Sequence, residues 1–125
     1  MVAGIVICHS LLAFELVNAA QKILGRTEFL YPFSNDNMAP GMILQNLTDT
    51  LKRNESRQII AMVDLRGGSC WAAAKMLTRE FPETRVLSGV NIPMLISFLT
   101  KRDKFPFEEL PKILESDALR GITAE

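Results

Sequence analysis

The chain of 125 residues contains two kinds of hydrophobic pattern that follow one another repeatedly. Residues 2–8 form an uninterrupted apolar run that ends at Cys8 and is rich in β-branched residues. Such a run is typical of a strand covered on both faces. After this run, apolar residues recur every three or four positions, as they do on one face of a helix. The whole pattern predicts strands at 2–8, 28–33, 58–64 and 84–88, and helices at 12–24, 40–53, 70–81, 94–100 and 106–119.

Capping and breaking residues mark several boundaries of these elements. Ser10 is predicted to cap the start of the first helix, and Gly25 to end it. Pro32 lies inside the second predicted strand and weakens that prediction, because proline cannot donate to a sheet. Residues 121–125, after the last helix, are predicted to pair as a short edge strand.

The alternation of strands with helices indicates how the chain is connected. Strands separated by helices at these intervals imply right-handed crossovers and a parallel sheet with helices on both faces. The predicted fold class is therefore α/β, a three-layer sandwich around a mainly parallel, four-stranded sheet. The length of 125 residues and the hydrophobic content of 48% favour one domain with one core, over residues 1–125.

Charge and cysteine content exclude several kinds of protein. Fourteen basic and fourteen acidic residues cancel, and basic residues cluster no further than adjacent pairs, so nucleic acid is not an expected partner. The two cysteines do not resemble a disulfide framework, which favours the reducing cytoplasm. The apolar run at 2–8 is too short to span a membrane and has no basic segment before it, so we expect neither a signal peptide nor membrane insertion.

Polar residues that follow the predicted strands are the candidates for chemistry. His9, Asp64 and the segment Gly67-Gly68-Ser69 are expected at the carboxyl edge of the sheet, where such folds bind ligands. A carboxylate beside an imidazole holds one ring nitrogen and leaves a lone pair on the other, which makes a nucleophile. Glycines let backbone N–H groups approach an anion, and helix N-termini favour a phosphoryl group. Together these features suit a histidine that is transiently phosphorylated.

The same residues also have ordinary structural uses, which the pattern alone leaves open. A histidine at a strand end is often only a hydrogen-bonded structural residue, and Asp64 is equally suited to cap a helix or a turn. Cys8 is expected in the core, because neighbouring strand residues point to opposite faces. Cys70 is either a thiolate favoured by a helix N-terminus or a small packed residue, and Arg66 either an anion ligand or a solvated loop residue. One histidine without a second histidine or a cysteine cluster predicts no metal site, and no cofactor is expected.

Three segments, GIVICHSLLAFELVNAAQKILG, AMVDLRGGS and SGVNIPML, carry a more specific likeness. In this order they resemble the IIA component of the bacterial phosphoenolpyruvate-dependent sugar phosphotransferase system (PTS), of the mannose/fructose/sorbose family, over nearly the whole chain. The resemblance implies a four-stranded parallel sheet and a homodimer in which a C-terminal antiparallel edge strand is exchanged between subunits.

The resemblance also implies a role for each candidate residue. His9 would accept a phosphoryl group from the phosphocarrier protein HPr and pass it to a IIB component, which works with membrane IIC and IID components in sugar uptake. Asp64 would orient His9. The residues implied around the phosphoryl group are Ser10, Arg66, Gly67, Gly68 and Ser69.

Two other functions are compatible with the sequence. One is a regulatory module of the same fold, in which phosphorylation of His9 controls a partner protein. It is suggested by Arg66 and Cys70, where members of the family often carry an aromatic residue and a proline. The other is the phosphotransfer subunit of dihydroxyacetone kinase, suggested by Ser10 directly after the histidine, although the segment GVNIPML fits that family less well.

Overall fold

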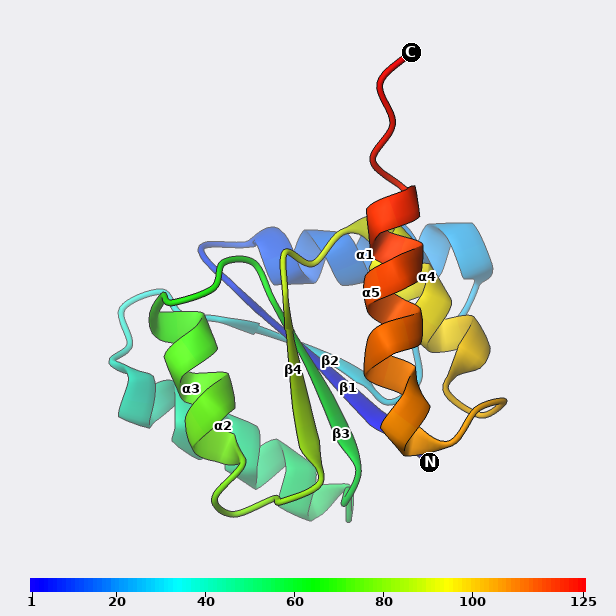
Figure 1. Ribbon diagram of the computed structural model, residues 1–125. Coiled ribbons are helices and arrows are strands. Elements are labelled where there is room, and N and C mark those ends of the chain that lie inside the picture. Colours follow the sequence, from blue (N-terminus) through cyan, green and yellow to red (C-terminus); the bar gives the residue numbers. More distant parts are fainter.

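The computed structural model describes all 125 residues and contains four strands and five α-helices. Figure 1 shows how they are arranged. The strands are β1 (Ala3–Cys8), β2 (Leu30–Ser34), β3 (Ile59–Val63) and β4 (Thr84–Ser88). The helices are α1 (Leu12–Leu24), α2 (Pro40–Arg53), α3 (Ser69–Leu77), α4 (Ile92–Lys101) and α5 (Leu110–Arg120), the last preceded by the 3-10 turn η1 (Phe107–Glu109). The prediction of a strand at 121–125 is wrong for the single chain, because this tail extends away from the body without pairing (Figure 1).

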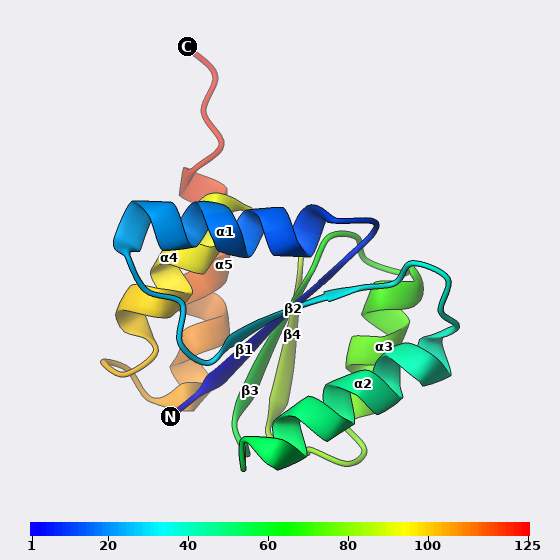
Figure 2. The same ribbon diagram turned by 180° about the vertical axis from the view of Figure 1, so that it is seen from behind.

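All four strands are parallel and stand in the order β2-β1-β3-β4, which confirms the predicted fold class. Helices α1, α4 and α5 cover one face of the sheet, and α2 and α3 cover the other (Figures 1 and 2). The chain leaves β1 through α1 toward one edge and leaves β3 through α3 toward the other. The strand order therefore reverses between β1 and β3, and their carboxyl ends flank the position where open α/β sheets bind ligands.

The core has two layers, one on each face of the two central strands. Both β1 and β3 are buried at every position, in agreement with their uninterrupted apolar patterns. Gly4 has a packing role, because a Cβ atom there would lie 2.7 Å from the ring of Phe98. The glycine thus lets α4 lie directly on β1. No helix combines the length and the apolar content that crossing a membrane requires.

The connection from β1 to α1 differs from the prediction. Ser10 does not cap the helix: its φ is 54°, in the left-handed region, and Leu11 occupies the N-cap position without a side-chain hydrogen bond. A residue in this conformation turns the chain sharply. The helix consequently starts at Leu12, three residues after His9.

The outer edge of β2 explains how a proline fits inside a strand. The backbone N–H of Gly4 donates to the carbonyl of Phe29 at 2.8 Å, and that of Asn35 donates to the carbonyl of Cys8 at 3.2 Å. Because successive backbone groups face opposite sides, the odd-numbered residues of β2 face β1 and Pro32 faces outward. Its missing N–H group therefore costs the sheet no hydrogen bond.

The outer edge of β4 is open by the same reasoning. The N–H of Ile59 donates to the carbonyl of Glu83 at 2.9 Å, so the odd-numbered residues of β4 face β3. The guanidinium of Arg85 donates to the carbonyl of Thr84 at 3.1 Å and covers it. The outward backbone groups of Val86 and Ser88 have no strand beside them.

Candidate functional site

His9 and Asp64 follow the two central strands directly, and the fold brings them into contact. The Oδ2 atom of Asp64 accepts hydrogen bonds from Nδ1 of His9 at 2.7 Å and from the His9 backbone N–H at 2.8 Å. Its Oδ1 atom accepts from the N–H of Leu65 at 2.9 Å. Because an ionised carboxylate only accepts hydrogen bonds, the imidazole hydrogen lies on Nδ1 and the lone pair lies on Nε2.

The environment keeps Asp64 ionised and His9 accessible. Burial acts to raise the pKa of Asp64, but the hydrogen bonds from the backbone and ring of His9 and from Leu65 outweigh it and lower the pKa below its usual range. The side chain of Asp64 is 12% exposed, whereas that of His9 is 50% exposed. The imidazole is thus anchored through one nitrogen while half of its side chain remains open to solvent.

The glycine segment lies beside the imidazole ring. Gly67 has a φ of 87°, in the left-handed region that favours glycine, and Gly68 is the N-cap of α3. A Cβ atom on Gly68 would lie 3.7 Å from Cε1 of His9, so this backbone runs next to the ring. The N–H of Ala72 bonds to the carbonyl of Gly68, which leaves the earlier amides of α3 without a helical acceptor. Amides of this kind at a helix N-terminus favour anions.

Asn35 is a residue of this site that the sequence did not indicate. Its side-chain amide, in the loop after β2, donates to Oγ of Ser69 at 2.9 Å. Since the Ser69 oxygen accepts this bond, its own O–H group is the donor of the residue, and it lies within hydrogen-bonding reach of the Cys70 thiol. Residues 34–37 fall between the predicted strand at 28–33 and the predicted helix at 40–53, and loop residues have no periodicity that reveals their contacts.

The other predicted residues have different positions. Ser10 is exposed in its left-handed turn, and Arg66 is exposed and takes part in none of the ion pairs. Cys8 is fully buried, which confirms the core prediction, and burial, with Asp64 adding to it, raises the pKa of its thiol to about 12.

Cys70 is also fully buried, and burial followed by the charge of Asp64 raises its pKa to about 11. It is therefore a packed thiol rather than a thiolate. One ligand atom each from Cys70, His9 and Asp64 nevertheless lie within 4.8 Å of one another, a set that can hold a metal ion. The expectation of no metal site depended on spacing along the chain, which does not reveal this convergence.

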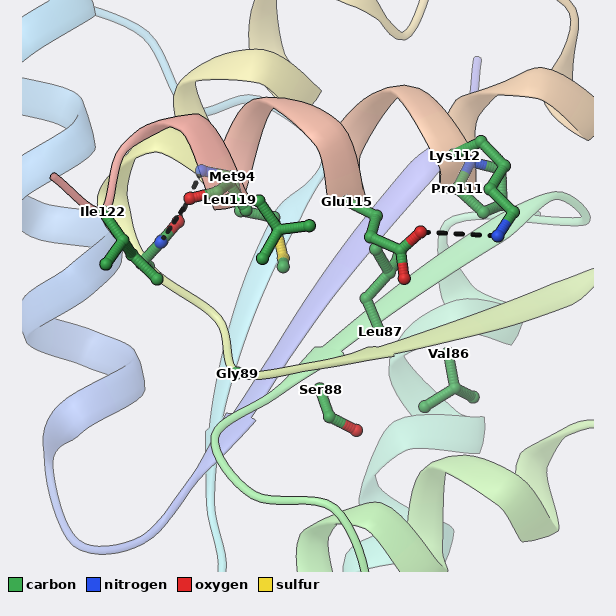
Figure 3. Close-up of a pocket in the computed structure, with 12 residues that line it drawn as sticks. Val86, Leu87, Ser88, Gly89, Met94, Pro111, Lys112, Glu115, Leu119 and Ile122 are labelled. Atoms are coloured by element: carbon green, nitrogen blue, oxygen red, sulfur yellow. Dashed lines mark hydrogen bonds and ion pairs between the residues drawn. The ribbon is translucent and has the colours of Figure 1, made fainter.

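A groove of about 490 Å³ lies elsewhere, between β4 and α5. Figure 3 shows Leu87 and Glu115 facing one another across it, with Ile122 at one end. Neither His9 nor Asp64 lines this groove. The His9–Asp64 pair thus sits outside it, on the loop edge of the sheet.

The fold and the site together define a class: a doubly wound parallel α/β protein with a carboxylate-bonded histidine where the strand order reverses. Residues 4–115 match the family model described as the PTS system fructose IIA component. The chain therefore belongs to the mannose/fructose/sorbose family of PTS IIA components, which are phosphotransferases of sugar transport, as the resemblance implied.

Individual relatives agree with this assignment. The chain is 29% identical over 126 residues to the PTS system mannose-specific EIIAB component of Escherichia coli K12, covering 98% of the chain but only 39% of that relative. It is 25% identical over 122 residues to the PTS system sorbose-specific EIIA component of Klebsiella pneumoniae, and the match covers 94% of the chain and 87% of that relative. The fold matches the crystal structure of the phosphotransferase system component EIIA from Streptococcus agalactiae with a TM-score of 0.91 and 21% identity. The match covers 99% of this chain and 97% of that one.

Proposed function

We propose that His9 is the residue of this IIA component that accepts a phosphoryl group from HPr and passes it to a IIB component. The observation that carries the proposal is the 2.7 Å hydrogen bond between Nδ1 of His9 and Asp64. It fixes the orientation of the ring and leaves Nε2 as the nucleophile. Residues 1–125 would act as a single IIA domain in the cytoplasm.

The transfer step follows from this arrangement. The Nε2 lone pair of His9 attacks the phosphorus of phosphohistidine on HPr in line, an Nε2–P bond forms, and the N–P bond to HPr breaks. The hydrogen on Nδ1 stays in its bond to Asp64, whose negative charge stabilises the positively charged phosphoimidazole. Transfer to the IIB component is the same substitution in the opposite sense, with Nε2 of His9 as the leaving group.

The loop beside the ring provides the donors for the transferred group. Gly68 lines one side of the imidazole and is the N-cap of α3, a helix of nine residues, so we expect the first amides of α3 and the O–H group of Ser69 to donate to the transferred group. The positive end of the helix dipole offsets the phosphoryl charge. Gly67 is required for the turn that brings these amides into place.

Exposed apolar side chains around the site support contact with protein partners. Leu11 is 63% exposed, Phe14 is 44% exposed and Leu65 is 61% exposed. They are close in sequence to His9 and Asp64, and exposed apolar groups of this kind mark interaction surfaces. We infer that HPr and the IIB component bind here in turn, with Ser10 and Arg66 among the polar contacts.

The open edge of β4 supports the proposed homodimer. The outward backbone groups of Val86 and Ser88 are unpaired, the groove beside them is partly apolar, and the tail that begins at Gly121 is extended. A strand donated by the tail of a second subunit would supply the missing hydrogen bonds.

The function is tested by incubating the chain with phosphoenolpyruvate, enzyme I and HPr and recording ³¹P NMR spectra. We expect an acid-labile phosphohistidine with the phosphorus on Nε2. Absence of the adduct, or phosphorus on Nδ1, contradicts the proposal. A IIB component should then remove the label; a label that persists would contradict the transport role and favour the regulatory one.

A further inference from the structure

Three side chains with different metal-binding atoms converge at the loop edge of the sheet. His9 comes from the end of β1, Asp64 from the end of β3 and Cys70 from the first turn of α3, and one ligand atom of each lies within 4.8 Å of the others. Imidazole nitrogen, carboxylate oxygen and thiolate sulfur are the three atom types with which proteins bind Zn²⁺. We propose that this triad binds a thiophilic divalent cation of the Zn²⁺ class, with a water in the fourth position.

The geometry requires only a small movement. Zinc lies about 2.3 Å from sulfur and about 2.0–2.2 Å from nitrogen and oxygen, so a tetrahedral site places its ligand atoms roughly 3.3–3.6 Å apart. A pair 4.8 Å apart therefore closes by roughly 1.2–1.5 Å, and the Nδ1 atom of His9 and the Oδ2 atom of Asp64, now 2.7 Å apart, separate by roughly 0.6 Å. Cys70 is fully buried, so the half-exposed ring of His9 is the part that moves and through which the ion enters.

Binding has a defined chemical balance. The Cys70 thiol gives its proton to solvent and forms the sulfur–metal bond, and the carboxylate of Asp64 binds through one oxygen. His9 binds through Nδ1, which loses its hydrogen to solvent while Nε2 takes one up, so that Nε2 no longer carries the lone pair that transfer needs. The two negative ligands neutralise the double charge of the ion. Because the charges of the ion and its two negative ligands cancel, burying them partly costs less free energy than burying an unpaired charge.

The consequence for activity rests on the proposed function, whereas the binding itself does not. The imidazole and carboxylate that hold the ion are the groups proposed for phosphoryl transfer. Occupancy by the cation and by the phosphoryl group therefore exclude one another. The site makes the carrier sensitive to free zinc through Cys70, a residue that the transfer step does not use.

The binding test is a titration of the full chain with Co²⁺, followed by displacement with Zn²⁺. We expect a thiolate-to-cobalt charge-transfer band in the near ultraviolet, which disappears as zinc is added. The Cys70→Ser variant should lose the band, and the Cys8→Ala variant should keep it, because Cys8 is not among the three residues whose ligand atoms converge. A band that is absent in the original chain, or unchanged in Cys70→Ser, overturns the proposal.

A second variant covers the case in which Cys70→Ser does not fold. His9→Ala removes a half-exposed ligand, and we expect it to raise the dissociation constant for Co²⁺ at least about tenfold. An unchanged constant would also overturn the site.

Inhibition is measured separately with purified phospho-HPr, so that enzyme I is absent. In the original chain, zinc should lower the phosphorylation rate in proportion to the fraction of sites that it fills. In Cys70→Ser, the phosphorylation rates with and without zinc should be equal. If the cobalt band forms while phospho-HPr never transfers its group, the proposed function fails and the metal site stands.

Discussion

The loop edge around His9 and the groove beside β4 differ in almost every property. The groove is a concave space of about 490 Å³ whose polar lining includes one exposed ion pair, between Lys112 and Glu115. The loop edge holds a half-exposed imidazole, a partner carboxylate and free amides. A group that must meet the imidazole of another protein has to be presented rather than enclosed. Under the proposed function, concavity is therefore the wrong guide to the phosphoryl acceptor, and the groove belongs to the proposed dimer contact.

The largest expected effect is a loss of phosphorylation at the loop edge with no change in association through the groove. His9→Gln should abolish phosphorylation by phospho-HPr, because no other imidazole exists in the chain. The same variant should leave the dimerisation constant unchanged, as measured by sedimentation equilibrium. Residual acid-labile phosphate on His9→Gln would contradict the assignment of the nucleophile.

Asp64→Asn tests the anchor of the imidazole. A hydrogen bond to a charged group contributes about 1.5–3 kcal/mol, so we expect phosphorylation to slow about 10- to 100-fold. Stopped-flow mixing with phospho-HPr measures the rate. Asp36→Asn, an exposed carboxylate in the loop after β2, is the matched control and should transfer at the original rate. Equal rates for Asp64→Asn and the control would remove Asp64 from the mechanism.

The groove is tested by Ile122→Ser, which removes an apolar side chain that is 73% exposed in the single chain. Burying such a side chain in a dimer contributes about 1.5–3 kcal/mol, so the dimerisation constant should weaken at least about tenfold. Phosphorylation should remain within about twofold. Ile23→Ser, also exposed but at the end of α1, is the control. An identical shift in both variants would mean that the groove is not the dimer contact.

Asn35 should have a smaller effect on transfer. A neutral hydrogen bond contributes about 0.5–1.5 kcal/mol, so Asn35→Ala should slow phosphorylation roughly 2- to 10-fold through a less ordered Ser69 hydroxyl. Asn35→Asp should be slower still, because the new carboxylate accepts the Ser69 proton and repels the phosphoryl group. A rate for Asn35→Asp equal to that of Asn35→Ala would argue that the hydroxyl does not donate to the phosphoryl group.

The smallest effect concerns stability and pH. The pKa of Asp64 is lower in the folded chain than its unfolded value of about 3.9, so its ionised form stabilises the fold above that pH. This contribution is lost as the pH falls through the lowered folded pKa. Urea unfolding at pH 7 and pH 3 should show a larger loss of stability for the original chain than for Asp64→Asn. Parallel losses would show that Asp64 does not contribute in this way.

The elements and the central pair were within reach of sequence reasoning, because periodicity locates strands and carboxyl ends of parallel strands meet at one edge. His9 and Asp64 are adjacent for that reason. The error at Ser10 arose because serine is a common N-cap, whereas a three-residue connection here needs a left-handed turn. The contact of Asn35 with Ser69 depends on β2 lying next to β1, a fact of strand order that local patterns do not contain.

Pro32 has a consequence for polymerisation. A sheet that accepted new strands at both edges would grow without limit, as fibres do. The outward proline of β2 lacks the donor that an incoming strand needs, so growth is blocked at that edge, while the edge of β4 remains open. Association through strand addition at a single edge stops once two copies have satisfied each other. In the proposed homodimer, this one residue on the far side of the sheet would limit assembly to a closed pair.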